Sequence, residues 1–366
     1  MSNFDIANIA LQAVCPGNEM LYDDKGLPSV MVKIPKKTWA QLGLGDSTDV
    51  FPAWIVNGEE VDFIYFSKYQ NSVGNSRAYS LPAQDPKTEV ALDKAIEFCS
   101  AKGEGWHVCT RLEWMAVALW CLKNNFLPLG NNNYGKDVSE NLYKAVPVSE
   151  YGGENGRVAT GTGPLTWSHD GTLSGIWDMN GNIWEWNGGV RFVKGELQVI
   201  SNDGVTFGND AADTDNSQSA TSSLWRAIDG TTGALIAPDG NGTTSKSLKL
   251  DWYNSKWKWV TGALSTQEDA YRNCLFEEIT TDSGVSEFAK RKLQALGLLK
   301  SSDSEGIYDS GKFFFNNGAD ERAFHAGGHF HNGTESGIFA ACVENSRTKS
   351  DGGLGFRATY VKLPTV

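Results

Sequence analysis

The chain has 366 residues, of which 40% are hydrophobic and 21% charged, and its 32 basic and 44 acidic side chains give a net charge of -12. That length suggests two or three domains, or one large elaborated domain. The acidic balance argues against nucleic-acid binding, which needs clustered lysine and arginine, and no apolar run approaches the ~20 residues of a membrane-spanning helix. The 40 glycines and 13 tryptophans are typical of a turn-rich fold with a core of large rings.

The N-terminal residues MSNFDIANIALQAVC contain neither a basic region nor a continuous apolar stretch. We therefore predict no signal peptide and synthesis in the cytoplasm. The six cysteines are scattered and include no C-x-x-C pair. Without an export signal they are expected to be reduced and mostly buried.

Residues 1–55 are predicted to form an N-terminal lead-in segment, and the main domain is expected to span 56–366. The run Asp62–Phe66 is rich in β-forming residues and predicts a strand. A helix is expected over 88–101 and is ended by Gly103. A second helix is expected to begin at Thr110–Glu113, where the threonine hydroxyl and the glutamate carboxylate can each accept from a free backbone N–H.

The segment Gly175–Trp186 reads GIWDMNGNIWEW. Its Asn180-Gly181 dipeptide tolerates positive φ, which predicts a tight turn before the next strand. Arg191–Ile200 is predicted to form a hairpin that turns at Lys194-Gly195.

Residues 202–284 are rich in Asp, Ser, Thr and Gly. We interpret them as a long polar insertion, partly ordered by aromatic islands at Leu224–Arg226 and Trp252–Trp259. A last helix is predicted over about Val285–Leu296 and ends at Gly297.

In the C-terminal segment, glycines alternate with aromatic residues, and the residues between them are small or polar without a period of 2 or 3.6. This pattern is found in irregular β-regions generally. It also suits a rigid backbone frame that leaves the intervening side chains free to face solvent.

Three landmarks resemble the formylglycine-generating-enzyme-like branch of the C-type lectin fold. Gly175–Trp186 is similar to the signature D-x-N-G-N-V-W-E-W of that branch, and Thr110–Trp114 is similar to its T-x-x-E-W helix start. The frame from Gly327-Gly328 to Gly355–Arg357 resembles its R-G-G-x-W … G-F-R ending. The resemblance implies an α+β, C-type lectin-like fold with small twisted antiparallel sheets, two flanking helices and long loops.

One subfamily is more similar still, the variable proteins of diversity-generating retroelements. The tail matches their pattern of glycines, aromatic residues and the final G-F-R, and Trp167–Gly171 and Leu296–Leu299 also resemble that subfamily. Phe330 stands where Trp is usual and Ala326 where Arg is usual, and neither departure alters the glycine frame. In this family an error-prone reverse transcriptase rewrites the 3′ end of the gene at adenines.

The resemblance places a variable region at about 322–357. Asparagine codons are favoured targets, and their mutation reaches His, Asp, Ser, Gly, Ala, Cys or Thr. The implied ligand-binding positions are residues in gaps of the frame: His325, His329, His331, Thr334, Ser336, Ala340, Cys342, Glu344, Ser350, Asp351, Gly352 and Gly353. The implied scaffold residues are Gly327, Gly328, Phe330, Gly333, Gly337, Phe339, Arg347, Gly355, Phe356 and Arg357.

An enzymatic role is the alternative. Formylglycine-generating relatives use a pair of cysteines near the C-terminus, whereas this segment has Cys342 alone, so we expect no catalytic site. His325, His329 and His331 could bind zinc, but their positions fit an exchangeable surface better, and no metal is predicted. Structural calcium in the Asp-rich loops is an open possibility, and no other cofactor is expected.

These features predict a non-enzymatic protein that binds an unknown protein or glycan, for example a cell-surface receptor. The resemblance suits a receptor-binding protein of a bacteriophage or prophage, carried on the virion, or a surface-displayed protein. A homo-oligomer would raise its avidity.

Overall fold

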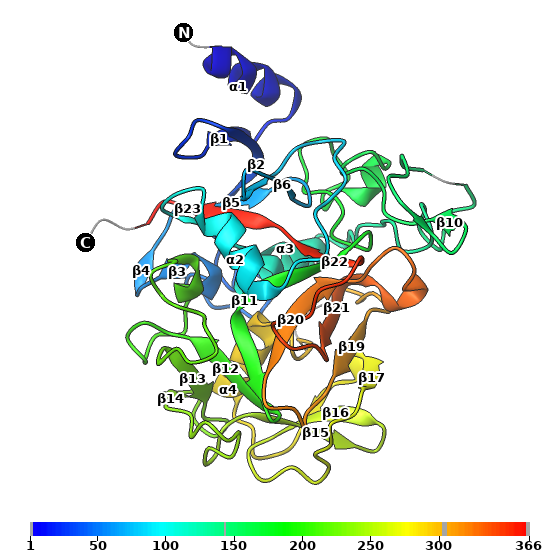
Figure 1. The fold of residues 1–366 in the computed structure, drawn as a ribbon. Helices are drawn as coiled ribbons and strands as arrows, with labels where there is room; N and C mark the ends of the chain where they lie inside the picture. The colour runs from blue at the N-terminus through cyan, green and yellow to red at the C-terminus, as the bar shows by residue number, and fades with distance from the viewer. Residues whose placement is uncertain (1–2, 143, 302–305, 364–366) are drawn as a thin grey trace.

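The computed structural model describes residues 3–142, 144–301 and 306–363, and it is mixed α/β with few helices (Figure 1). Two sheets form most of the fold, one with five strands and one with twelve. The α-helices in the described residues are α1 (Asn3–Val14), α2 (Leu92–Ser100), α3 (Arg111–Lys123) and α4 (Glu287–Ala295). None of them is long and apolar enough to cross a membrane.

The five-stranded sheet joins the two ends of the chain, which Figure 1 shows in blue and red. Its order is β1 (Asn18–Tyr22), β2 (Pro28–Pro35), β5 (Phe63–Ser67), β23 (Ala358–Val361) and β8 (Trp106–Val108). β2 pairs with β5 over Met31–Pro35. The boundary predicted near residue 55 therefore divides one sheet, and β1 and β2 are not a separate lead-in.

Two helices pack near this sheet. α3 begins as predicted: Thr110 caps it, and Glu113 completes the reciprocal capping box. α2 begins at Leu92, four residues later than the predicted start, because Glu89 has a φ of 58°, which a helix does not allow. The helix α4 lies elsewhere in the chain and agrees with the prediction. Ser286 caps its start, and Gly297, with a φ of 58°, follows its end.

The twelve-stranded sheet fills the lower half of the molecule in Figure 1. Its main path is β17 (Arg272–Leu275), β19 (Lys312–Phe315), β21 (Gly337–Val343), β20 (Arg322–Gly327), β11 (Trp184–Val193), β12 (Glu196–Ile200), β15 (Lys249–Tyr253), β16 (Lys256–Val260) and β18 (Thr280–Thr281). β13 (Trp225–Ile228), β14 (Leu235–Ile236) and β22 (Leu354–Phe356) join it at the side. The remaining strands form two-stranded ribbons: β3 (Ile55–Val56) with β4 (Glu59–Glu60), β6 (Ser72–Gly74) with β7 (Arg77–Tyr79), and β9 (Glu150–Tyr151) with β10 (Glu154–Asn155).

The polar segment 202–284 is more ordered than the sequence suggests. It supplies β13 to β18 to the large sheet, and its Trp257 and Trp259 are fully buried in the main core. Those rings anchor the segment, so it is a part of the domain's core and not only an insertion on its surface.

Two predicted turns have different outcomes. Lys194-Gly195 turns the β11–β12 hairpin with positive φ at both residues, as expected. In the other motif, positive φ occurs at Gly181 and Asn182 instead of Asn180, because Asn182 reaches into a buried hydrogen-bond network.

Candidate functional site

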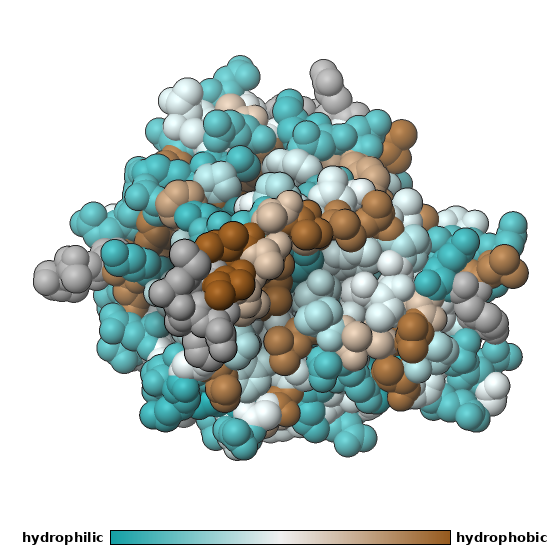
Figure 2. Space-filling model, turned by 90° about the horizontal axis from the view of Figure 1, so that it is seen from above, coloured by the Kyte–Doolittle hydropathy of each residue, from teal (hydrophilic) through white to brown (hydrophobic). Residues whose placement is uncertain are grey.

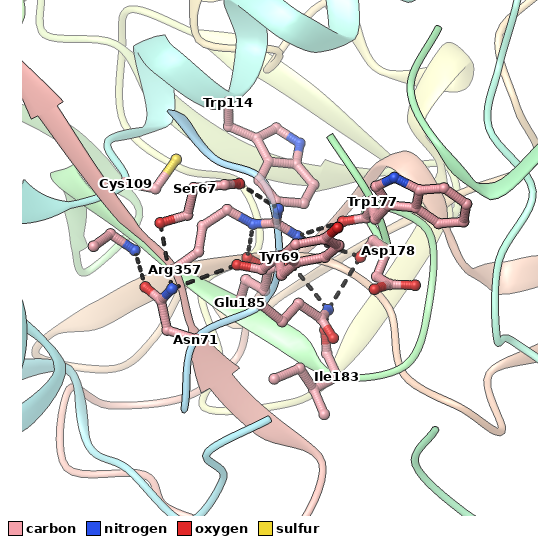
Figure 3. A network of polar contacts seen from close by, with 12 residues as sticks. Ser67, Tyr69, Asn71, Cys109, Trp114, Trp177, Asp178, Ile183, Glu185 and Arg357 are labelled. Carbon is pink, nitrogen blue, oxygen red and sulfur yellow. Dashed lines mark hydrogen bonds and ion pairs between the residues drawn. The ribbon is translucent and has the colours of Figure 1, made fainter. Parts of the chain in front are cut away.

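A buried ion pair holds the C-terminal frame in place (Figure 3). Arg357 donates to both carboxylate oxygens of Glu185 at 2.5 and 2.6 Å, and both side chains are at most 1% exposed. Burial alone would lower the pKa of Arg357, but the Glu185 carboxylate outweighs it and raises the pKa. Arg357 also donates to the carbonyls of Ser67 and Trp177, both at 3.1 Å. This pair joins the final G-F-R to the Trp184–Trp186 strand.

The predicted scaffold residues are nearly all buried. Phe339, Phe356 and Arg357 are 0% exposed, and Phe330 and Arg347 are 5% and 8% exposed. A Cβ at Gly355 would lie 2.3 Å from the Lys87 carbonyl oxygen, so the backbone there fits only glycine. The residues of the frame are therefore constrained by packing.

The twelve predicted binding positions divide into three groups by exposure. Thr334, Ser350 and Gly352 are exposed. His329, His331, Glu344 and Asp351 are half-buried. His325, Ser336, Ala340, Cys342 and Gly353 are buried.

The expectation of solvent-facing side chains is wrong for the buried group. Ala340 and Cys342 lie on β21, where they belong to a hydrophobic cluster that includes Trp184 and Trp186. Their neighbours Phe339 and Ala341 point to the main core instead. β21 is an interior strand with a core on each face, and so its alternating side chains are all enclosed.

Three of the predicted positions, His325, His329 and His331, form a row of rings with Trp184. The His325 and Trp184 rings are 5.1 Å apart, and those of His329 and His331 are 4.0 Å apart. Trp184 also lies 6.4 Å from His329, which connects the two pairs. Asp351 acts electrostatically on all three histidines. The structure thus brings together β20, the loop that follows it and the loop that contains Asp351.

The three imidazoles are uncharged at neutral pH. Burial lowers the pKa of His325 to about 3 and that of His329 to about 4, and it also lowers the pKa of His331. Asn345 donates its amide N–H to Nε2 of His325 at 3.1 Å. A neutral His325 that accepts at Nε2 carries its proton on Nδ1, so it presents a donor there.

Unpartnered polar atoms are frequent at the predicted binding positions. The described residues contain nine buried side-chain nitrogen or oxygen atoms without a hydrogen-bond partner, and four of them belong to predicted binding positions. They are Nδ1 of His325, His329 and His331 and Oγ of Ser336. Each such atom costs about 1–3 kcal/mol of stability. A surface shaped for binding tolerates that cost more readily than one shaped for stability alone.

Three aromatic residues of this site were not predicted as binding positions. The His331 ring is stacked 4.8 Å from Tyr151 and 6.0 Å from Tyr134, at interplanar angles of 17° and 16°. Trp184 belongs to the Gly175–Trp186 motif, where the sequence predicts only a strand residue. One sequence feature could have indicated Tyr151 as a binding residue. Tyr151 precedes Gly152-Gly153, and a glycine pair favours a turn, where a neighbouring ring is exposed.

The described residues contain no group of three His, Cys, Asp or Glu side chains arranged to hold a metal ion. All six cysteines are free and buried, as expected. Burial raises the pKa of Cys342 well above its usual value, which keeps this thiol protonated. In the Asp-rich loops, the carboxylates of Asp203 and Asp239 accept hydrogen bonds from backbone N–H groups two or three residues further along the chain, which is the role of turn-capping carboxylates.

Residues 48–212 match the family model of the sulfatase-modifying factor enzyme 1-like domain. The sulfatase-modifying-factor-like match includes the Thr110 helix start and the Gly175–Trp186 motif, and it supports the C-type lectin-like fold inferred from them. It ends before the C-terminal segment that contains the histidines. No curated protein matches the chain.

Proposed function

We propose that this protein is a non-enzymatic ligand-binding protein whose segment 322–357 forms an exchangeable binding surface, diversified by a retroelement at adenines. The main support is the concentration of unpartnered polar atoms at four of the predicted positions. The buried frame around them supports the same proposal, because it can hold the backbone while other side chains change.

The exposure groups refine the proposed surface. Seven positions are open to solvent at least in part and are proposed as freely exchangeable: His329, His331, Thr334, Glu344, Ser350, Asp351 and Gly352. The five buried positions are proposed to exchange among small or shape-matched residues only. Gly353 illustrates the limit, since a Cβ there would lie 2.6 Å from the His329 ring.

The alternative is a formylglycine-generating type of enzyme, which has the same domain. Against it, the predicted variable region has one thiol, Cys342, which is protonated and donates to the Glu344 carboxyl at 3.9 Å. A copper site of two thiolates needs a second sulfur beside it. We therefore favour binding over catalysis.

The proposed ligand is a protein or glycan, for example a receptor on a cell surface. A bacteriophage or prophage protein carried on the virion, or a protein displayed on a cell, would use such a surface. Assembly into a homo-oligomer would raise the avidity of a weak site.

The first test is the DNA around the gene. A near-copy of the sequence that encodes 322–357, different almost only at adenines, is expected nearby together with a reverse transcriptase gene. Absence of both would contradict the diversification and leave the enzymatic alternative as the better explanation.

The second test is a selection. The full chain is displayed with the seven open positions randomised and is selected against lysozyme, a small basic protein. A control library randomises the exposed Thr231, Thr232 and Ala234 on the β13–β14 side of the molecule. We expect binders from the first library and few from the second, and equal yields would contradict the proposed surface.

A further inference from the structure

A segment outside the predicted variable region exposes an unusual number of apolar side chains. Within 131–157, Val138, Leu142, Val146 and Tyr151 are 41%, 71%, 57% and 53% exposed. This segment ends in the β9–β10 hairpin at one side of the molecule, where hydrophobic side chains also show in the view from above (Figures 1 and 2). Exposed apolar groups that gather in one place mark interaction sites more often than single ones do.

This segment, which we call the tyrosine segment (the described residues 131–142 and 144–157), is joined to the predicted binding surface. The backbone N–H of Tyr134 donates to the Phe330 carbonyl at 2.7 Å, and that of Gly333 donates to the Asn132 carbonyl at 2.8 Å. The His331 ring lies against the rings of both Tyr134 and Tyr151. A ligand that touches His331 therefore also meets these tyrosines.

Three cavities in the described part of the chain lie away from the tyrosine segment. Small-molecule sites are concave cavities of roughly 300–1,000 Å³. The cavities of 510, 350 and 270 Å³ in this fold are lined by other residues, around Arg191, Lys249 and Lys102 respectively. A surface of open rings suits a flat macromolecular partner better.

The composition and charge of the tyrosine segment narrow the partner class. Tyrosines set among Gly, Ser and Asn are the residues that antibody loops use to contact proteins, since they give large rigid contacts at low entropic cost. On the hairpin, Glu154 pairs across from Tyr151 and Glu150 precedes it, and all three residues are exposed, so the hairpin that carries this ring is acidic. The whole chain carries a charge of -12, which favours encounter with a basic protein.

We propose that the tyrosine segment is the constant half of the binding site and that its partner is a folded protein with an apolar patch bordered by basic residues. The proposal rests on the proposed function and adds the part of the site that diversification leaves unchanged. Tyr151 is its central contact, and the exchangeable residues beside it set the specificity.

The test uses a lysozyme binder from the selection described above. In that full-length binder, Tyr151→Ala is expected to weaken binding at least tenfold. Tyr253→Ala is the matched control, because Tyr253 is 52% exposed on β15, in the large sheet, and it is expected to change affinity less than twofold. Thermal unfolding of both variants checks that each remains folded.

The outcomes separate the two proposals. If no binders emerge, the proposed function fails. If binders emerge and Tyr151→Ala leaves their affinity within twofold, the proposal that the tyrosine segment is a constant half of the site is wrong, and the proposed exchangeable surface is unaffected. Amide hydrogen exchange is an independent readout, since lysozyme should slow exchange at 134–151, and unchanged exchange there would overturn the inference.

Two further arms test the partner class. Selection against α-lactalbumin, which has the lysozyme fold but an acidic surface, should give fewer binders, and an equal yield would overturn the basic preference. The unselected chain is followed by analytical ultracentrifugation. Self-association that Tyr151→Ala abolishes and Tyr253→Ala does not would identify a second copy as the occupant and overturn the protein partner proposed here.

Discussion

Arg357 and Glu185 form a two-point ion pair that is closed off from solvent, and it joins residues 172 positions apart in the chain. Gln70 donates to the same carboxylate at 3.0 Å, and Asn182 donates to Gln70 at 2.8 Å, so the pair belongs to a larger buried network. The final G-F-R and the W-E-W motif are thus two halves of one structural unit.

We expect Glu185→Gln to destabilise the protein by about 3–5 kcal/mol, because it leaves the Arg357 guanidinium buried without a counter-charge. Asp85→Asn is the control, since it breaks the ion pair of Asp85 with Arg157, whose side chains are 46% and 18% exposed. That change should cost less than about 1 kcal/mol. Urea denaturation measures both, and equal effects would contradict the structural role of the buried pair.

Gly352, in the loop before β22, and Gly355, on β22, should respond differently to an added methyl group. At Gly355, a Cβ would lie 2.3 Å from the Lys87 carbonyl oxygen, whereas nothing lies within 4 Å of a Cβ at Gly352. Gly355→Ala should therefore destabilise by roughly 1–3 kcal/mol, and Gly352→Ala should be nearly neutral. The melting temperatures of the two variants measure this difference. If Gly355→Ala does not lower the melting temperature, the backbone at Gly355 does not lie as close to Lys87 as the structure shows.

Asparagine substitutions test which predicted positions can be exchanged. Ala340 is 0% exposed within an apolar cluster, so Ala340→Asn should cost about 1–3 kcal/mol for the buried amide. Ser350 is exposed, and Ser350→Asn should stay within about 0.5 kcal/mol. Chemical denaturation distinguishes them. A well-tolerated Ala340→Asn would return this position to the freely exchangeable set.

Acid should destabilise the fold in part through His325. Its pKa is about 3 in the folded protein and near 6.5 when unfolded, so between those values the unfolded chain binds the extra proton. Stability contributed by the neutral ring is therefore present above pH 6.5 and is lost as the pH falls, at roughly 1.4 kcal/mol per pH unit.

The variant His325→Asn removes this titration. Its free energy of unfolding, measured from pH 7 to pH 4.5, should fall less steeply than that of the unmodified protein. Thr334→Ala, at an exposed position that does not titrate, should keep the original slope. Parallel curves for all three proteins would show that His325 is not held neutral by burial.

Local sequence determined the elements whose signals are short-range. The Thr110–Glu113 capping box and the Lys194-Gly195 turn were predicted correctly, because a cap and a two-residue turn depend on neighbouring residues alone. The motif Gly175–Trp186 likewise led to the fold that the domain match supports.

Only the tertiary structure decided which side chains of the C-terminal segment are open. Whether Ala340 faces solvent depends on what covers β21 from elsewhere in the chain, and here Trp184 and Trp186 cover it. The contact between His331 and Tyr151 joins residues 180 positions apart, and no local pattern encodes it. Exposure is a property of packing between distant segments, so the sequence indicated the frame and the folded chain set the surface.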